Sequence, residues 1–314
     1  MSIIEKAVKR LDQLKSAAGE GVVESAPLPE ALVLPEDKPL APKVESNAPV
    51  VATPAPVRAQ PKSVHIDLAR LAARGLVTPD QPRSAIAEEF RLIKRPLLAN
   101  AVLEGPAAVD NGNLIMISSA LPGEGKTFNA INLAISMAME LDYTVLLVDA
   151  DVSRPSVLRE FDLPPQPGLM DVLAGEVEDL SEVLLKTNID KLSILPAGMP
   201  HQRATELLAS DGMTQLLEQM AHRYADRIIV FDSPPLLVTT ESRVLATHMG
   251  QVVLVVEAER TTHAHVRQAL AAIEPCPIRM MVLNKSRDRS VGGYYGYGYG
   301  YGYGKAPEAS SEAA

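Results

Sequence analysis

The segment from Ala120 to Thr127, Ala-Leu-Pro-Gly-Glu-Gly-Lys-Thr, most constrains the fold of this 314-residue chain. An apolar run at residues 114–118 precedes it, and a helical pattern follows. Gly123 and Gly125 would let backbone amides close around a phosphate, and the N-terminus of the following helix adds positive potential. Although alanine stands at position 120 where the usual pattern has glycine, the order strand, loop, helix predicts a phosphate-binding loop.

The alternative is a glycine-rich turn that binds nothing. Two consecutive residues argue against it, because Lys126 would reach the β- and γ-phosphate oxygens of a nucleotide and the Thr127 hydroxyl would bind Mg²⁺. We therefore expect the loop and the first turn of its helix to bind the nucleotide. The residues concerned are Pro122, Gly123, Glu124, Gly125, Lys126, Thr127 and Phe128.

Acidic residues end two further apolar runs. Asp149 and Asp151 close the run that begins at Thr144, and Asp232 closes the run that begins at Arg227. The carboxyl ends of strands in an open α/β sheet border the ligand crevice, where carboxylates can hold Mg²⁺ or accept a proton. Taken alone, each could instead cap a helix or lie in solvent. Beside a phosphate loop, the functional interpretation is favoured.

Short apolar, β-branched runs alternate with longer helical patterns between residues 113 and 285. Such near-continuous apolar strands between helices are typical of a parallel sheet covered on both faces. We therefore predict an α/β fold with one doubly wound, mostly parallel sheet. The predicted strands are Leu114 to Ser118, Thr144 to Asp149, Leu192 to Leu195, Arg227 to Asp232, Val252 to Glu257 and Met280 to Leu283. The helical pattern from Ser84 to Asn100 contains Pro96, which we expect to kink or end its first half.

The flanks differ from this central part. Residues 1–20 have the pattern of a basic amphipathic helix, for which packing on protein and lying on a membrane are both open. Residues 21–63 contain nine prolines and predict an extended or disordered linker. The segment 291–314 predicts a disordered, reachable tail because tyrosine alternates with glycine there. Six of the chain's eight tyrosines lie in it: Tyr294, Tyr295, Tyr297, Tyr299, Tyr301 and Tyr303.

Composition excludes some functions. A formal charge of −9 gives no basis for binding nucleic acid. The single cysteine, Cys276, excludes an intramolecular disulfide and fits a reducing compartment. The sequence has no apolar run long enough to span a membrane. We expect a cytoplasmic protein whose membrane association, if it has one, is peripheral.

Residues 66 to 304 resemble the bacterial tyrosine kinases that use a phosphate loop, most closely those of exopolysaccharide and exosortase loci. The resemblance rests on Ala120 to Thr127, Asp149-Ala-Asp151, Asp232-Ser-Pro-Pro235 and the tyrosine-rich tail. It implies that residues 64–290 form a kinase domain with ATP and Mg²⁺ as cofactors. It further implies Lys126 and Thr127 as ligands of ATP-Mg²⁺ and Asp151 and Asp232 in the metal shell. By the same resemblance Asp149 accepts the tyrosine proton, with Asp151 as the alternative, and Asn284 contacts the adenine.

The resemblance also implies partners. Glu88, Arg91 and Lys94 resemble a Glu-x-x-Arg-x-x-Arg helix that mediates ring-like self-association, with lysine in the last place. A solvated helix with an i,i+3 ion pair is the alternative. The implied partners are further copies of the chain, phosphorylated in trans, and a membrane-embedded polysaccharide chain-length or co-polymerase protein. Such a partner would hold the kinase peripherally at the inner membrane.

The expected function is an ATP-dependent tyrosine kinase that autophosphorylates its C-terminal cluster and regulates exopolysaccharide synthesis or export. One rival is a non-kinase ATPase switch of the partition and septum-positioning type. Those ATPases usually carry a second lysine early in the loop, where this chain has Leu121, which favours the kinase. A second rival is a scaffold with degenerate chemistry, and the complete set of Lys126, Thr127 and the three aspartates argues against it.

Overall fold

The computed structural model describes residues 62–103, 105–223 and 227–287. Within them, eight strands form one sheet in the order β1-β4-β5-β3-β6-β2-β7-β8. Every neighbouring pair is parallel except β4 and β5. The strands are β1 (Lys62–Val64), β2 (Leu114–Ser119), β3 (Thr144–Asp149), β4 (Leu185–Thr187), β5 (Leu192–Leu195), β6 (Arg227–Asp232), β7 (Gln251–Glu257) and β8 (Ile278–Asn284).

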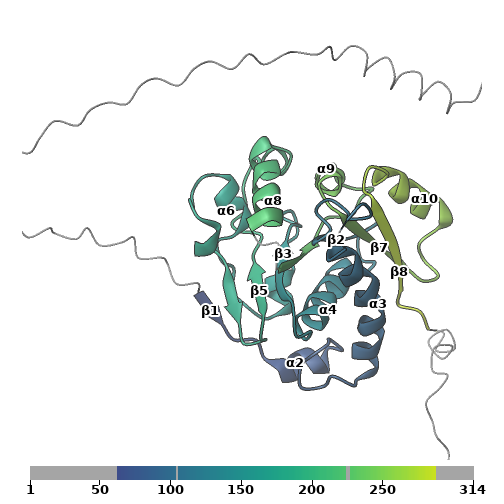
Figure 1. Cartoon of the computed structure of the whole chain (residues 1–314). Coiled ribbons are helices and arrows are strands. Elements are labelled where there is room, and N and C mark those ends of the chain that lie inside the picture. The colour runs from purple at the N-terminus through teal and green to yellow at the C-terminus, as the bar shows by residue number, and fades with distance from the viewer. Residues whose placement is uncertain (1–61, 104, 224–226, 288–314) are drawn as a thin grey trace, which may run out of the picture. The chain divides into compact units, whose positions relative to one another are not determined.

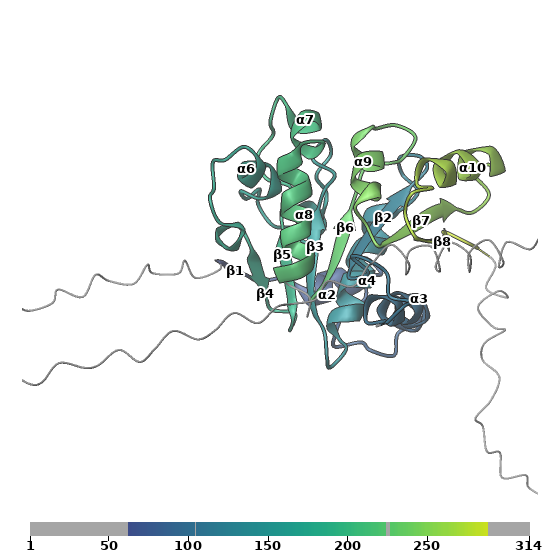
Figure 2. The ribbon, with the colours of Figure 1, turned by 45° about the horizontal axis from the view of Figure 1, so that its top comes forward.

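Helices cover both faces of this sheet (Figures 1 and 2). One core cluster contains residues of α2 to α5, and the other contains residues of α6 to α10. Side chains of β2 alternate between the two clusters, with Ile115 and Ile117 in the first and Leu114 and Met116 in the second. The α-helices are α2 (Leu68–Ala73), α3 (Ala85–Ala101), α4 (Lys126–Ala138), α5 (Val157–Glu160), α6 (Leu169–Leu173), α7 (Ala204–Leu208), α8 (Asp211–Arg223), α9 (Glu241–Thr247) and α10 (His263–Ala272), and a 3₁₀ turn, η1, spans Leu180–Glu182.

The predicted doubly wound, mostly parallel sheet is confirmed, and each of the six predicted strands is present. Of the two outcomes predicted for Pro96, a kink or an end of the helix, the end is excluded, because α3 continues to Ala101. Pro96 and Leu92 are both exposed. The Leu92 carbonyl, whose i+4 donor is missing at Pro96, therefore lies on the solvent side of the helix, where water can replace the donor.

The strand register brings the predicted carboxylates together. β6 lies between β3 and β2, and Asp149 is the register partner of Asp232 across β3 and β6. β2 runs parallel to β6 and leads into α4. The phosphate loop and both acidic strand ends therefore meet at one edge of the sheet.

The predicted amphipathic helix at 1–20, the linker except for its last two residues, and the tail at 291–314 lie outside the described residues. Lys62 and Ser63, which the sequence assigned to the linker, belong to β1. Within the described ranges, none of the helices has the length and apolar character needed to cross a membrane.

Candidate active site

The phosphate loop connects β2 to α4 and depends on glycine. Gly125 directly precedes α4 with φ 99°, and Gly123 has φ 86°. Both values lie in the left-handed region that side chains with a Cβ rarely adopt. A Cβ at Gly125 would also collide with the side-chain amide of Asn284. The loop can therefore adopt this backbone conformation only because positions 123 and 125 lack side chains.

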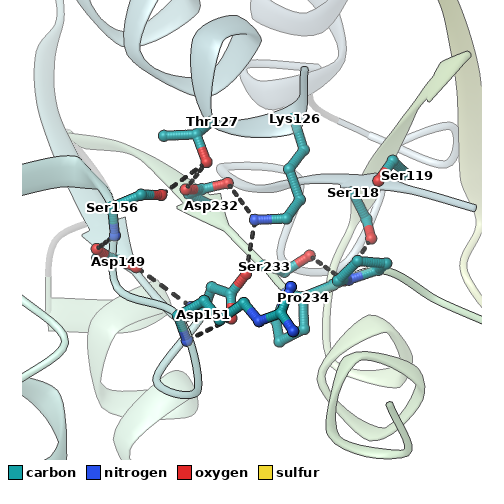
Figure 3. A network of polar contacts seen from close by, with 12 residues as sticks. Ser118, Ser119, Lys126, Thr127, Asp149, Asp151, Ser156, Asp232, Ser233 and Pro234 are labelled. Carbon is teal, nitrogen blue, oxygen red and sulfur yellow. Dashed lines mark hydrogen bonds and ion pairs between the residues drawn. The ribbon is translucent and has the colours of Figure 1, made fainter. Parts of the chain in front are cut away.

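Lys126 lies against two of the predicted carboxylates (Figure 3). Its Nζ donates a hydrogen bond to Asp151 Oδ2 at 2.6 Å and lies 3.7 Å from Asp232 Oδ1. Burial by itself would lower the pKa of Lys126, but the negative charges of Asp232 and Asp151 outweigh it and raise the pKa. The ammonium is therefore charged at neutral pH and links the phosphate loop to both acidic strand ends.

Asp232 and Thr127 form the next part of the site. The Thr127 hydroxyl donates to Asp232 Oδ2 at 2.7 Å, and its oxygen lies 2.9 Å from Ser156 Oγ. Asp232 is fully buried, and burial raises its pKa to about 6 although Lys126 and Thr127 act in the opposite direction. Asp232 Oδ1 is buried and has no hydrogen-bond partner among the described residues.

This donor set fits Mg²⁺. The cation prefers oxygen ligands and is usually held by one or two carboxylates together with substrate phosphates and water. Asp232 Oδ1 lacks a hydrogen-bond donor, and the Thr127 hydroxyl lies beside the same carboxylate. Across the described ranges, no group of three or more His, Cys, Asp or Glu side chains could hold a metal by itself. The oxygens of water and of a bound phosphate would therefore complete the shell of a magnesium ion here.

Asp149 has different contacts from Asp151. Its Oδ2 accepts from the backbone amides of Ser156 and Val157 at 3.0 Å each, and its Oδ1 accepts from the amide of Asp151 at 3.3 Å. The side chain is buried, and burial, followed by the charge of Asp232, raises its pKa to about 7. Asp149 therefore holds the loop between β3 and α5 in shape.

A cleft of about 450 Å³ opens beside Lys126 and Thr127. Besides the phosphate loop, the loop after β3, α5 and the loop after β6 line it. Asp151 lines the cleft, whereas Asp149 does not. Of the residues predicted to bind the nucleotide, Glu124 and Asn284 are absent from the lining, and those present are Pro122, Gly123, Gly125, Lys126, Thr127 and Phe128.

Glu124 and Asn284 instead form hydrogen bonds that stabilise the phosphate loop. The buried Glu124 carboxylate accepts from the Leu121 amide at 2.8 Å and from the Thr261 hydroxyl. Asn284 Nδ2 donates to the Glu124 carbonyl at 2.9 Å, and Lys285 Nζ donates to the Gly123 carbonyl at 2.7 Å. The loop after β7 and the end of β8 thus hold the phosphate loop in the shape that its glycines allow.

Sequence reasoning missed Ser156, Thr261 and Lys285. Each approaches the loop from a distant segment, and none belongs to a motif of its own. The only signal was indirect: Lys285 follows the predicted Asn284 at the end of β8.

Known proteins resemble this chain in sequence and structure. A family model described as "AAA domain" matches residues 112–281. The tyrosine-protein kinase YwqD of Bacillus subtilis is 30% identical over 228 residues, which cover 71% of this chain and 92% of that protein. The succinoglycan biosynthesis transport protein ExoP of Rhizobium meliloti is 34% identical over 69% of this chain but only 27% of its own length. A crystal structure of the chimerical protein CapA2B2 superposes with a TM-score of 0.56 at 26% identity, covering 71% of this chain and 93% of that one.

The match to YwqD spans nearly all of that protein and most of this chain. This chain belongs to the bacterial tyrosine kinases. The family assignment made from the sequence is therefore confirmed.

In this kinase, the three residues predicted for self-association have different environments. Glu88 and Arg91 form an i,i+3 ion pair on the partly exposed side of α3. Lys94 is buried, donates to the Ser136 carbonyl and pairs with Glu140 at 2.9 Å. Lys94 thus joins α3 to α4 within one chain, which leaves Glu88 and Arg91 as the accessible members of the motif.

The tyrosines of the kinase that the sequence singled out, Tyr294 to Tyr303, lie outside the described residues. The last described residue is number 287, three positions after the end of β8. Asn284 at that strand end contacts Glu124 of the phosphate loop. The polypeptide therefore leaves the sheet next to the phosphate loop, seven positions before the first tyrosine of the cluster.

Proposed function

We propose that the kinase transfers the γ-phosphoryl group of ATP to the tyrosines of its own C-terminal cluster. The observation that carries this proposal is the position of Lys126, which joins the phosphate loop to Asp151 and Asp232. Phosphoryl transfer needs positioning and charge neutralisation more than covalent chemistry. The described site supplies a cation, buried carboxylates and a glycine-bounded loop in one place.

Each residue then has a part in transfer. The backbone amides of Gly123 and Gly125 and the charge of Lys126 hold the β- and γ-phosphates. Thr127 and Asp232 would hold Mg²⁺, which neutralises phosphate charge when it is bound. The apolar burial around Asp232 keeps water away from the carboxylate and strengthens its interactions with cations.

The proton of the acceptor phenol must also move during transfer. A free phenol has a pKa near 10, so its proton has to pass to a base as the new bond forms. The sequence assigned this role to Asp149, with Asp151 as the alternative. We favour Asp151, because it lines the cleft and Asp149 does not, and because three backbone amides donate to Asp149 but only one is seen to donate to Asp151 within the described residues.

The proposed acceptor is the tyrosine cluster of this chain or of a neighbouring copy. Tyr294 follows Asn284 by ten residues, and a fully extended segment of that length reaches about 35 Å from the phosphate loop. A segment of that length could enter the cleft of a neighbouring copy, which supports transfer between copies. Glu88 and Arg91 on α3 are the proposed contact between copies.

We further propose a role in exopolysaccharide synthesis or export, together with a membrane-embedded chain-length or co-polymerase partner. ExoP, whose name refers to succinoglycan biosynthesis and transport, and the chimera named CapA2B2 support this context. Residues 1–20 would bind the partner and keep the kinase peripherally at the inner membrane. Recovery of the partner in a pull-down, with and without residues 1–20, tests this assignment, and equal recovery would remove the segment from it.

The experiment on the main proposal uses the full chain with labelled ATP and Mg²⁺. We expect label on the tail tyrosines of the wild type and a loss of about 100-fold or more in Lys126→Met, because the loop lysine stabilises charge in the transition state. The rival, an ATPase switch, predicts ATP hydrolysis with an unlabelled tail. Label that persists in Lys126→Met would exclude autokinase activity.

A further inference from the structure

Two arginines in the cleft have no part in the transfer described above. Arg154 lies in the loop after β3 and Arg159 lies in α5, and both are exposed while lining the same cleft as Lys126. The backbone amide of Arg154 donates to Asp151 Oδ1 at 3.1 Å. Within residues 62–103, 105–223 and 227–287, neither guanidinium group has an ion pair or hydrogen bond.

Some exposed arginines of the described residues are paired: Arg70 and Arg74 with Asp162, Arg91 with Glu88, and Arg260 with Glu257. Others, such as Arg267, have no such partner among these residues, but Arg154 and Arg159 are the two arginines that line this cleft. Their guanidinium groups therefore place unpaired positive charge beside it. Guanidinium groups bind phosphate with paired, charge-assisted hydrogen bonds, so a phosphate is a fitting ligand.

The lining of the cleft also has an apolar part. Pro234, Pro235 and Val238 belong to it, and Val238 is 60% exposed. Apolar side chains and two guanidinium groups in one cleft suit a ring that carries an anion. Phosphotyrosine has this chemistry, whereas the ATP phosphates already have the phosphate loop and Lys126 as partners.

The spacing in the cluster fits such a site. From Tyr295 to Tyr303, tyrosine alternates with glycine. In an extended peptide, side chains two residues apart lie on the same side at about 7 Å. A phosphotyrosine held by Arg154 and Arg159 would therefore place the next tyrosine about 7 Å away, in the cleft that Lys126 also lines.

We propose that Arg154 and Arg159 form a phosphotyrosine-binding subsite, so that each modified tyrosine of the cluster favours phosphorylation of its neighbour. This inference rests on the proposed kinase function and adds a rule for substrate choice to it. It explains why several closely spaced tyrosines would be phosphorylated more efficiently than a single one. The phosphotyrosine formed in the first transfer improves binding of the segment that carries the next tyrosine.

The test uses the full chain with its six cluster tyrosines changed to phenylalanine, so that it has no internal acceptor in the cluster. The peptide Gly-Tyr-Gly-Tyr-Gly of residues 296–300 is offered unmodified, phosphorylated at Tyr297, or phosphorylated at Tyr299. We expect kcat/KM for at least one phosphorylated form to exceed that of the unmodified peptide by about tenfold, mainly through KM.

Arg154→Ala and Arg159→Ala should each bring this ratio toward one without changing the Kd for ATP. Arg267→Ala, an exposed arginine of α10 outside the cleft lining, is the matched control and should keep the ratio. Equal kcat/KM for all three peptides in the parent would overturn the subsite and leave the kinase function standing. The subsite would also be overturned if Arg154→Ala and Arg159→Ala both kept the preference for a phosphorylated peptide. The same holds if these variants only weakened ATP binding and left that preference unchanged. Transfer to none of the peptides by a chain that binds ATP would contradict the proposed function as well.

Discussion

Gly125 is the residue at which the shape of the phosphate loop can be tested most cleanly. Its φ of 99° is unfavourable for alanine, and a Cβ there would displace Asn284. We predict that Gly125→Ala abolishes measurable ATP binding in a fluorescence titration. Gly75→Ala is the control, because Gly75 has φ 76° but nothing within 4 Å of an added Cβ. It should cost about 1 kcal/mol of stability and leave ATP binding intact. Equal losses of ATP binding in Gly125→Ala and Gly75→Ala would contradict a specific role of Gly125 in the phosphate loop.

The roles of Asp149 and Asp151 can be distinguished by changing each residue to asparagine. Asp151→Asn removes the carboxylate in the cleft, so we expect a fall in kcat of about 100-fold or more. It also removes one counter-charge of Lys126, but Asp232 remains 3.7 Å away, so we expect a smaller fall in melting temperature than for Asp149→Asn. Asp149→Asn weakens the acceptor of three backbone amides, so we expect it also to lower the melting temperature. Calorimetry and initial rates check both. If only Asp149→Asn lowered kcat, the original assignment of the proton to Asp149 would be restored.

Single residues of the loop were predictable because Pro122 to Phe128 are contiguous and the motif itself encodes its contacts. Ser156, Thr261 and Lys285 were not, since their contacts depend on how distant segments pack. The buried state of Asp149 was also hidden: an Asp-x-Asp pattern does not tell which carboxylate faces the cleft.

At the scale of elements, strands were recognised where burial is complete. β2, β3 and β6 are almost entirely buried and read as continuous apolar runs. β1 and β4 were missed because each has three residues and mostly polar or partly exposed side chains, which leave no apolar pattern. Their pairing comes from the sheet and not from their own sequence.

The contact between α3 and α4 gives a prediction on stability. The hydrogen bond from Lys94 is the main cause that lowers the pKa of Glu140 below its ordinary value of 4.5. Glu140→Gln leaves the buried Lys94 without its counter-charge, so we expect a loss of about 1–3 kcal/mol at pH 7 by urea denaturation. Because the pKa of Glu140 is lowered in the folded state, this contribution is present above pH 4.5 and disappears as the pH falls through the folded-state pKa.

Glu88→Gln is the matched control, because Glu88 pairs with an arginine of α3, the helix that also carries Lys94. Its ion pair with Arg91 is partly exposed, so we expect a change below about 0.5 kcal/mol. A difference between wild type and Glu140→Gln that stayed constant down to pH 3 would contradict the assigned ion pair.

For the whole molecule, phosphorylation changes the balance of charge. The chain has a formal charge of −9, and six phosphotyrosines would add about −9 to −12 at neutral pH. If tails enter neighbouring copies, their mutual repulsion should break the assembly. Light scattering before and after incubation with ATP-Mg²⁺ should therefore show a smaller particle for the wild type and no change for Lys126→Met. An unchanged particle size despite full phosphorylation would exclude this form of regulation.

The central claim is that this kinase phosphorylates its own tyrosine cluster. The most direct measurement is mass spectrometry of the full chain purified from its own organism, with the Lys126→Met chain expressed in its place for comparison. We predict phosphate on several tyrosines between Tyr294 and Tyr303 of the wild type and on none of them in Lys126→Met. An unmodified cluster in the wild type, or equal modification of both chains, would contradict the account.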